Sequence, residues 1–267
     1  MATGPDHTKG AEHMTAPLNH APVAAITGGA SGIGLAFARR WIQSGGRAVL
    51  LDFAPTSLDM ALAELGSEHA RGMIVDVTND DTVRAAVASI EAQEQRLDTV
   101  LNAAGIARPA PSAEVSDADF TSMLDIHVTG TMRMCRAAFP LLKRTGGTIV
   151  NVASVAALTG MPERASYTTA KAGVAGLTRT LAVEWGRDGV RVNAVGPGYV
   201  RTALIDSLIE QGKLRDTLIR ERTALGRFAE AAEIAEAIHF LASPASSYVN
   251  GHLLMADGGL TIDGNWY

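Results

Sequence analysis

The stretch Thr27-Gly28-Gly29-Ala30-Ser31-Gly32-Ile33-Gly34 joins a short apolar segment, residues 23–27, to an amphipathic segment that begins at Gly32. Glycine allows the backbone to turn tightly and to approach a ligand closely. The N-terminus of a helix offers free N–H groups and the positive end of the helix dipole, which suit a pyrophosphate. A glycine-rich turn between a strand and a helix therefore predicts a dinucleotide-binding site.

Short apolar segments alternate with helical segments along the rest of the chain. The expected strands are residues 23–27, 48–52, 72–76, 99–102, 148–153, 190–195 and 252–256. The expected helices are residues 32–44, 58–65, 80–95, 117–144, 163–185, 203–222 and 231–241, and Pro140 is expected to bend or shorten the fourth. This alternation is typical of a parallel sheet with helices on both faces. We therefore predict an α/β doubly wound fold of the Rossmann type, with a mostly parallel sheet of seven strands.

Composition limits the classes of function. The chain has 267 residues, 47% hydrophobic and 19% charged, with a net charge of -5, so we expect a folded protein with no nucleic-acid partner. No segment has the roughly 20 apolar residues that span a membrane. The single Cys135 excludes an intrachain disulfide and favours a reducing compartment, with the cytoplasm as the default. Residues 1–20 are interpreted as a flexible tail, and 21–267 as a single Rossmann-type catalytic domain.

Asp52 ends the second expected strand, eighteen residues after Gly34. A carboxylate at this place can accept hydrogen bonds from the ribose hydroxyls of NAD and would repel the 2′-phosphate of NADP. The alternative is that Asp52 serves only as a helix cap or turn residue. The position after the glycine turn favours the ribose role and predicts NAD as the cofactor.

Tyr167 and Lys171 lie four residues apart in an expected helix, so their side chains share one helical face. A phenol has an ordinary pKa of about 10, and a neighbouring cation stabilises the phenolate and lowers that pKa. Tyr167 is therefore a candidate acid and base. Ser154, thirteen residues upstream at the end of an apolar strand, is placed to hold a substrate oxygen. Taken alone, the Tyr-Lys spacing would be an ordinary helix face.

Together these motifs resemble the short-chain dehydrogenase/reductase family in its single-domain form, from about Val23 to the C-terminus. Further matching motifs are Asp76-Val77, Asn102-Ala103-Ala104-Gly105, Asn193 with Pro197-Gly198, and Asp257-Gly258-Gly259. The resemblance implies that Asp76 and Val77 contact the adenine, and that Pro197 and Gly198, with Val200 and Thr202, line the nicotinamide side. The cofactor-binding residues that follow are Gly28, Ser31, Gly32, Ile33, Gly34, Asp52, Asp76, Val77, Asn102, Ala103, Gly105, Tyr167, Lys171, Pro197, Gly198, Val200 and Thr202. It also implies a homotetramer, built partly through the helices that begin near Asp117 and Glu163.

His127 stands where the family often has an asparagine that completes a Ser-Tyr-Lys-Asn tetrad. In one interpretation its ring replaces the asparagine amide in a water-mediated proton relay to Lys171, since a neutral imidazole has one donor and one acceptor. In the other, it packs in the helix or bonds the local backbone. The neighbouring Lys171 is expected to keep the ring neutral.

Several other polar residues have a structural interpretation. Asn193 and the Asp257 turn are expected to be structural, and Arg108 is expected to be a solvated loop residue. The histidines near the N-terminus are irregularly spaced, so no metal site is predicted. Cys135 is expected to be a packing residue.

The resulting prediction is an NAD-dependent oxidoreductase that interconverts a secondary alcohol, such as a polyol, sugar or hydroxy compound, and its ketone. Ser154, Tyr167 and Lys171 are its catalytic residues, with His127 as a further candidate. The substrate is expected to be a small molecule in a pocket closed by residues 155–163, Tyr199 and 202–227. The residue types in these segments do not identify which small molecule it is. The alternatives are a 3-oxo acyl-thioester reductase of the same family, which typically uses NADPH, and a catalytically silent nucleotide-sensing protein. The presence of Ser154, Tyr167 and Lys171 together argues against the silent protein.

Overall fold

The sheet has the predicted seven strands. The computed structural model describes residues 21–202, 205, 209–210 and 216–264. The strands are β1 (Val23–Thr27), β2 (Arg47–Asp52), β3 (Ala70–Ile74), β4 (Thr99–Asn102), β5 (Thr148–Val152), β6 (Arg191–Pro197) and β7 (Leu253–Ala256). Their order is β3-β2-β1-β4-β5-β6-β7, and each neighbouring pair is parallel. The predicted doubly wound fold is confirmed.

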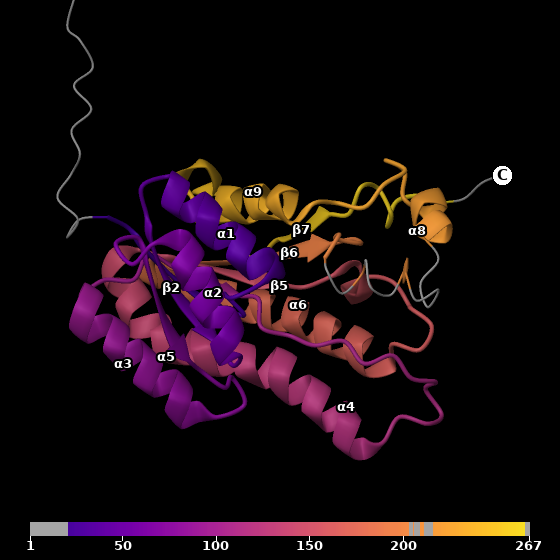
Figure 1. Ribbon diagram of the computed structural model, residues 1–267, viewed down its shortest axis with the longest axis horizontal. Coiled ribbons are helices and arrows are strands. Elements are labelled where there is room, and N and C mark those ends of the chain that lie inside the picture. Colours follow the sequence, from indigo (N-terminus) through magenta and orange to yellow (C-terminus); the bar gives the residue numbers. More distant parts are fainter. Residues whose placement is uncertain (1–20, 203–204, 206–208, 211–215, 265–267) are drawn as a thin grey trace, which may run out of the picture.

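Helices cover both faces of the sheet (Figure 1). One face carries α1 (Gly32–Gln43), α2 (Pro55–Leu65) and α9 (Ala231–Ala242). The other carries α3 (Asp80–Glu94), α5 (Gly130–Thr145) and α6 (Ala165–Trp185), with α4 (Asp117–Leu124) packed on α6. The short α8 (Asp216–Arg222) lies near the ends of β6 and β7. None of the described helices is long and apolar enough to cross a membrane.

The central strand β1 shows why the strands appear in the sequence as nearly continuous apolar runs. Ala24 and Ile26 face the core beneath α1 and α9, whereas Val23 and Ala25 face the core above α3, α5 and α6. All five residues of β1 are buried. A strand buried on both faces needs apolar side chains at every position rather than at alternate ones.

Several boundaries differ from the sequence prediction, and three of the differences affect the site or a stated expectation. Strand β3 ends at Ile74, so Asp76 lies in the turn after the strand and not within it. Strand β6 continues to Pro197. The predicted shortening of the fourth helix at Pro140 is wrong, because α5 runs through Pro140 to Thr145. The expected helix 203–222 is described as α8 from Asp216, and the tail 1–20 lies outside the described residues.

The expected helix 117–144 is also not uniform. A π-helical turn, η2 (Asp125–Thr129), separates α4 from α5. A π turn inserts one extra residue into the helical repeat and is frequent at functional sites. His127 is the middle residue of this turn and the one buried residue among its five.

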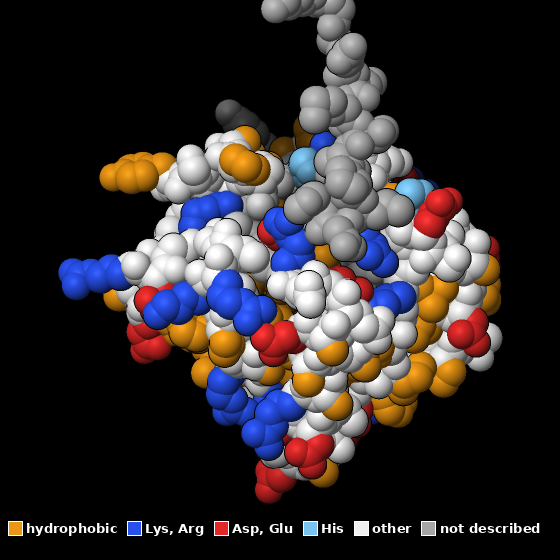
Figure 2. All heavy atoms as spheres, turned by 90° about the vertical axis from the view of Figure 1, so that its left-hand side faces the viewer, with side chains coloured by type: hydrophobic (Ala, Val, Ile, Leu, Met, Phe, Trp, Pro, Cys, Tyr) orange, Lys and Arg blue, Asp and Glu red, His pale blue; other side chains and the backbone are white. Residues whose placement is uncertain are grey.

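Charged side chains of both signs are interspersed on the face shown in Figure 2. Elsewhere in the described residues, exposed ion pairs include Arg39 with Glu64 and Arg144 with Glu91. Exposed pairs of this kind contribute little to stability, typically about 0–1 kcal/mol each.

Candidate active site

The glycine turn after β1 lies against the turn after β4. Gly28 has a φ of 64°, and a Cβ there would lie 2.8 Å from the backbone N of Ala104. A Cβ at Gly34 would collide with the carbonyl oxygen of Gly28. Both positions therefore require glycine, the first for its left-handed backbone and both for close approach.

The N-terminus of α1 is open in the way that a phosphate requires. Its N-cap residue Ser31 is extended and makes no side-chain cap hydrogen bond. Gly32 has a φ of 50°, and no heavy atom lies within 4 Å of the position that its Cβ would take. The first N–H groups of the helix and its positive end are therefore available to an anion. This turn fits the pyrophosphate of a dinucleotide.

Asp52, at the end of β2, is joined to the same turn. One carboxylate oxygen accepts the N–H of Ala30 at 3.0 Å, and the other accepts the N–H of Ala54 at 3.0 Å. The turn role that the sequence gave as the alternative is thus present. Each oxygen still has a lone pair for a further donor, so the same carboxylate can also accept a hydroxyl.

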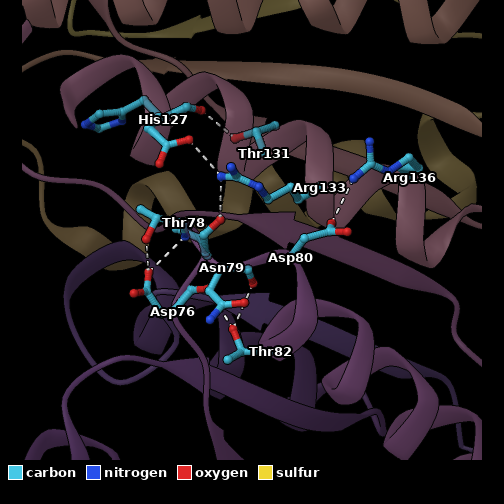
Figure 3. A network of polar contacts seen from close by, with 11 residues as sticks. Asp76, Thr78, Asn79, Asp80, Thr82, His127, Thr131, Arg133 and Arg136 are labelled. Carbon is cyan, nitrogen blue, oxygen red and sulfur yellow. Dashed lines mark hydrogen bonds and ion pairs between the residues drawn. The ribbon is translucent and has the colours of Figure 1, made fainter. Parts of the chain in front are cut away.

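The Asp76-Val77 turn is held to the π-helical region (Figure 3). Asp76 accepts the hydroxyl and N–H of Thr78, at 2.7 and 2.9 Å. Arg133 donates to the carbonyl oxygen of Val77 at 3.2 Å and to the Asp125 carboxylate at 2.8 Å. These contacts fix the turn beside α5, at the carboxyl ends of the strands, where the sequence expects the adenine.

The side chain of Asn102 points into the protein and not toward the open end of the site. It donates to Asn151 Oδ1 at 2.9 Å and to Cys135 Sγ at 3.3 Å, and Asn151 in turn donates to Thr178 at 2.9 Å. Burial raises the pKa of Cys135 to about 12, which keeps the thiol protonated. Asn102 therefore supports the strand ends from within, and its neighbours Ala103 and Gly105 form the surface of the turn.

Asn193 has the structural role that the sequence favours. Its amide donates to the carbonyl oxygen of Val249 at 2.9 Å, and its Oδ1 accepts the N–H of His252 at 3.0 Å. Arg108 lies in an exposed ion pair with Asp119, as expected for a solvated loop residue. In the part of the chain that the structure describes, no group of His, Cys, Asp and Glu could hold a metal ion.

Ser154, Tyr167 and Lys171 lie together at the end of β5. The Ser154 hydroxyl accepts the N–H of Ala156 at 3.1 Å and hydrogen-bonds Tyr167. Lys171 donates from Nζ to the carbonyl oxygen of Val152 at 2.7 Å, and this nitrogen lies 5.6 Å from the centre of the Tyr167 ring. A strand end and one face of α6 thus bring the three predicted side chains together.

Burial is the largest cause of the pKa shifts of Tyr167 and Lys171. It raises the pKa of Tyr167, while the hydrogen bond with Ser154 and the charge of Arg164 act in the opposite direction. The net direction is opposite to the one expected from Lys171, because desolvation of the phenolate outweighs its stabilisation by neighbours. Burial also lowers the pKa of Lys171 to about 8.

His127 is buried next to Tyr167, with 3% of its surface exposed. Its Nε2 lies 2.9 Å from the carbonyl oxygen of Ile106 and 3.1 Å from the Ile106 nitrogen, so either tautomer finds a partner there. Its Nδ1 is buried and has no hydrogen-bond partner. Burial, and then the charge of Lys171, lower the pKa of His127 to about 3, which agrees with the expected neutral ring.

The structure adds one residue that the sequence did not single out. Arg164 is the N-cap residue of α6, three positions before Tyr167, and its charge lowers the pKa of that tyrosine. Arg164 has no role of its own in the sequence-based prediction. Its spacing from Tyr167 was the available signal.

The expected nicotinamide side lies at the ends of β6 and β7. The N–H of Gly198 donates to the carbonyl oxygen of Ala256 at 3.2 Å, and Val200 forms a bridge with Ala229. Thr202 accepts the N–H of Ile205 at 3.3 Å. A cavity of about 470 Å³ lies beside this segment and is lined by Gly198, Tyr199, Thr223, Leu225, Met255 and Asp257. Neither Ser154 nor Tyr167 lines this cavity. The candidate catalytic position is therefore identified from the cluster of Ser154, Tyr167 and Lys171 and not from the cavity.

Comparison with known proteins gives consistent matches along nearly the whole chain. Residues 28–261 match a family model described as enoyl-(acyl carrier protein) reductase. The chain is 41% identical over 242 residues to galactitol 2-dehydrogenase (L-tagatose-forming) of Cereibacter sphaeroides, which covers 90% of this chain and 94% of that protein. It is also 41% identical over 242 residues to cis-4-hydroxycyclohexanecarboxylate dehydrogenase of Sinomonas cyclohexanicum, with 90% and 96% covered.

The fold has close counterparts among solved structures. The crystal structure of levodione reductase superposes with a TM-score of 0.84 at 30% sequence identity, covering 90% of this chain and 98% of that one. The similarity therefore extends over the sheet, its helices and the strand ends that carry the site.

Proposed function

Because the chain belongs to the short-chain dehydrogenase/reductase family, it is an oxidoreductase that acts on alcohol groups, and we propose that NAD is its preferred cofactor. The observation that carries the reaction type is the cluster of Ser154, Tyr167 and Lys171 at the end of β5. This end of the sheet also holds the glycine turn, as expected for a ligand crevice outside the carboxyl ends of parallel strands.

The dinucleotide would be held by the glycine turn, by Asp52 and by the Asp76-Val77 turn. When bound, its nicotinamide exchanges the hydride with the carbon of the substrate. The open N-terminus of α1 supports the pyrophosphate position. Asp52 supports NAD over NADP, because a carboxylate beside the glycine turn would repel a 2′-phosphate. The Pro197–Thr202 segment would line the nicotinamide side.

Ser154 and Tyr167 would handle the substrate oxygen. The Ser154 hydroxyl hydrogen-bonds this oxygen and stabilises the charge that develops on it. Tyr167 takes the hydroxyl proton during oxidation and returns it during reduction. Lys171, fixed by its hydrogen bond to Val152, supplies the positive charge beside the phenol ring.

His127 would connect Lys171 to solvent. Its Nε2 is occupied by Ile106, whereas its Nδ1 is buried without a partner. A buried polar atom without a partner is rare in proteins and requires an explanation. A water held at Nδ1 satisfies this atom and would serve as the relay position that the family fills with asparagine.

The substrate is a small molecule with a secondary alcohol or the corresponding ketone. One relative is named for a neutral polyol and the other for a hydroxycarboxylate, so the two names leave both classes open. The second candidate function is reduction of a 3-oxo acyl thioester, and a relative that is 36% identical over 245 residues and named 3-oxoacyl-[acyl-carrier-protein] reductase favours it. Asp52 argues against it, because those enzymes typically use NADPH.

We further propose a cytoplasmic homotetramer in which residues 21–267 form a single catalytic domain. An exposed apolar side chain on α6 supports an interface there, because Val183 is 83% exposed. Helices α4 and α6 would form part of the contact.

Reduction of NAD or NADP by a panel of secondary alcohols at alkaline pH tests this function. We expect NADH formation, and at least about tenfold tighter binding of NAD than of NADP, which corresponds to about 1.4 kcal/mol. Asp52→Asn keeps the shape of the side chain and should reduce this preference. Equal affinity of the wild type for both cofactors, measured by fluorescence titration, would remove the ribose role of Asp52.

A further inference from the structure

Arg164 carries a buried nitrogen that has no hydrogen-bond partner among the described residues. Its Nη1 is buried and makes no hydrogen bond, although the residue as a whole is only half-buried. A guanidinium is always charged and has five N–H donors. Leaving such a donor unpaired inside a protein costs free energy, which a bound acceptor would recover.

Several other arginines of this protein have carboxylate partners. Arg71 pairs with Glu94 at 2.7 Å, Arg133 with Asp125 at 2.8 Å, and Arg227 with Glu233 at 2.7 Å. Within the described residues, Arg164 has no ion-pair partner and its side chain has no hydrogen bond. It is therefore a half-buried cation, three residues before Tyr167, whose N–H donors are free to bind a carboxylate.

The segment that carries Arg164 is fixed in place. The carbonyl oxygen of Arg164 accepts the N–H of Thr168 at 2.8 Å, and the carbonyl oxygen of Glu163 accepts the N–H of Ala110 at 3.0 Å. Glu163 has a φ of 60°, in the left-handed region that is unfavourable for a residue with a side chain. Backbone strain of this kind often lies at ligand-binding sites. The strained residue directly precedes the unpaired arginine.

The surroundings of Arg164 also favour an anion. Helix α6 begins at Ala165 without a side-chain cap and has no acidic residue in its first turn. Its positive end is therefore not neutralised by the protein. Arg164 is the N-cap residue of α6 and Tyr167 follows three residues later, a spacing that puts the two side chains on the same side of the first turn. An anion bound by Arg164 would therefore lie on the side of the helix that carries the phenol.

We infer that Arg164 binds a carboxylate of the substrate, so that the alcohol oxidised at Tyr167 belongs to a hydroxycarboxylic acid and not to a neutral polyol. A planar carboxylate can accept two parallel N–H bonds from one guanidinium, which gives both energy and orientation. Arg164 is in this role a specificity-determining residue. The inference rests on the proposed oxidoreductase function.

The test compares matched pairs of alcohols that differ in the acid group: lactate with isopropanol, gluconate with glucitol, and hydroxycyclohexanecarboxylate with cyclohexanol. NADH formation gives kcat and KM for the wild type, Arg164→Gln, Arg164→Lys and Arg108→Gln. Arg108 is the matched control, because it is also a loop arginine but is exposed and already paired with Asp119. Circular dichroism confirms that each variant is folded.

We expect the wild type to prefer the acid member of at least one pair by about tenfold or more. Arg164→Gln should lower kcat/KM for that acid by about 10- to 150-fold, the range for loss of a charged hydrogen bond, mainly through KM. The neutral member should change by less than about threefold on the same scale. For the acid, kcat/KM of Arg164→Lys should lie between the values of the wild type and Arg164→Gln, because lysine keeps the charge but lacks the planar guanidinium that binds a carboxylate through two hydrogen bonds. Arg108→Gln should match the wild type.

Two results would overturn the inference and leave the proposed function in place. One is a wild type that oxidises the neutral alcohols with no preference for any acid. The other is an Arg164→Gln variant in which kcat/KM falls equally for the acid and the neutral alcohol of a pair and the pH profiles of both shift together. That result would mean that Arg164 acts only through the pKa of Tyr167. A wild type that oxidises no alcohol with either cofactor would refute the proposed function and this inference with it.

Discussion

The imidazole ring of His127 stands edge-on to the phenol ring of Tyr167, with 5.6 Å between ring centres and 89° between the ring planes. The two residues come from different elements, the π turn η2 and the first turns of α6. Edge-to-face packing of this kind is favourable by about 0.5–1.5 kcal/mol beyond its area. The relay candidate is thus also a packing partner of Tyr167, the candidate proton carrier, and experiments must separate the two roles.

Substitution of His127 tests the relay. We expect His127→Asn to remain active, because it restores the family's amide, and His127→Ala to lose turnover while it keeps NAD affinity. The reason is that alanine has no polar atom at the place of the unpaired Nδ1. Steady-state kinetics across the pH range and NAD titration measure both effects. An alanine variant with wild-type turnover at every pH would leave His127 with packing and its bond to Ile106 as its only roles.

Gly105 and His127 should be energetically coupled. A Cβ at Gly105 would collide with Cε1 of the His127 ring and lie 2.9 Å from its Nδ1. Gly105→Ala should therefore destabilise the wild type by about 1–3 kcal/mol, the usual cost of overpacking. In a His127→Asn background the shorter side chain leaves room, so the cost should fall by at least about 0.5 kcal/mol.

Denaturant unfolding of the four proteins in this cycle provides the measurement. Equal costs of Gly105→Ala in the two backgrounds would mean that the alanine is accommodated by the turn and not by movement of the ring.

The low pKa of His127 predicts a specific loss of stability in acid. The folded-state pKa is about 3 and the ordinary value is 6.5, so between these pH values the unfolded chain binds a proton that the folded chain does not. The free energy of unfolding should then fall as pH falls, by up to about 1.4 kcal/mol per pH unit from this group. His127→Asn should lack this contribution. Identical acid dependence in both proteins, measured by denaturant unfolding from pH 7 to 4, would contradict the prediction.

Burial of Tyr167 predicts how activity depends on pH. Its pKa is raised, so the phenolate that accepts the substrate proton becomes more abundant as pH rises through the alkaline range. Alcohol oxidation should therefore keep increasing above pH 8, whereas ketone reduction, which needs the phenol, should persist there. Tyr167→Phe should lower turnover about a hundredfold or more without loss of NAD binding. Wild-type turnover in that folded variant would exclude Tyr167 as the proton carrier.

The sequence alone determined the sheet and most of the site. Apolar runs such as β1 are recognisable because most side chains of a strand that is buried on both faces must be apolar. The glycine turn can be recognised in the sequence because only glycine fits at positions 28 and 34, where a Cβ would collide with neighbouring backbone atoms. Tyr167 and Lys171 were placed on one face by helical geometry, which depends only on spacing along the chain.

The tertiary structure alone decided the features that depend on contacts between distant segments. The π turn that buries His127 leaves no mark in the residue pattern, because the sequence 117–144 has the composition of an ordinary helix. The direction of the Tyr167 pKa shift required knowledge of its burial, which outweighs the hydrogen bond with Ser154 and the charge of Arg164. The unpaired nitrogen of Arg164 was likewise visible only in space. Burial and hydrogen-bond satisfaction are properties of all the elements that surround a side chain, so they follow from the packed fold and not from any local stretch of sequence.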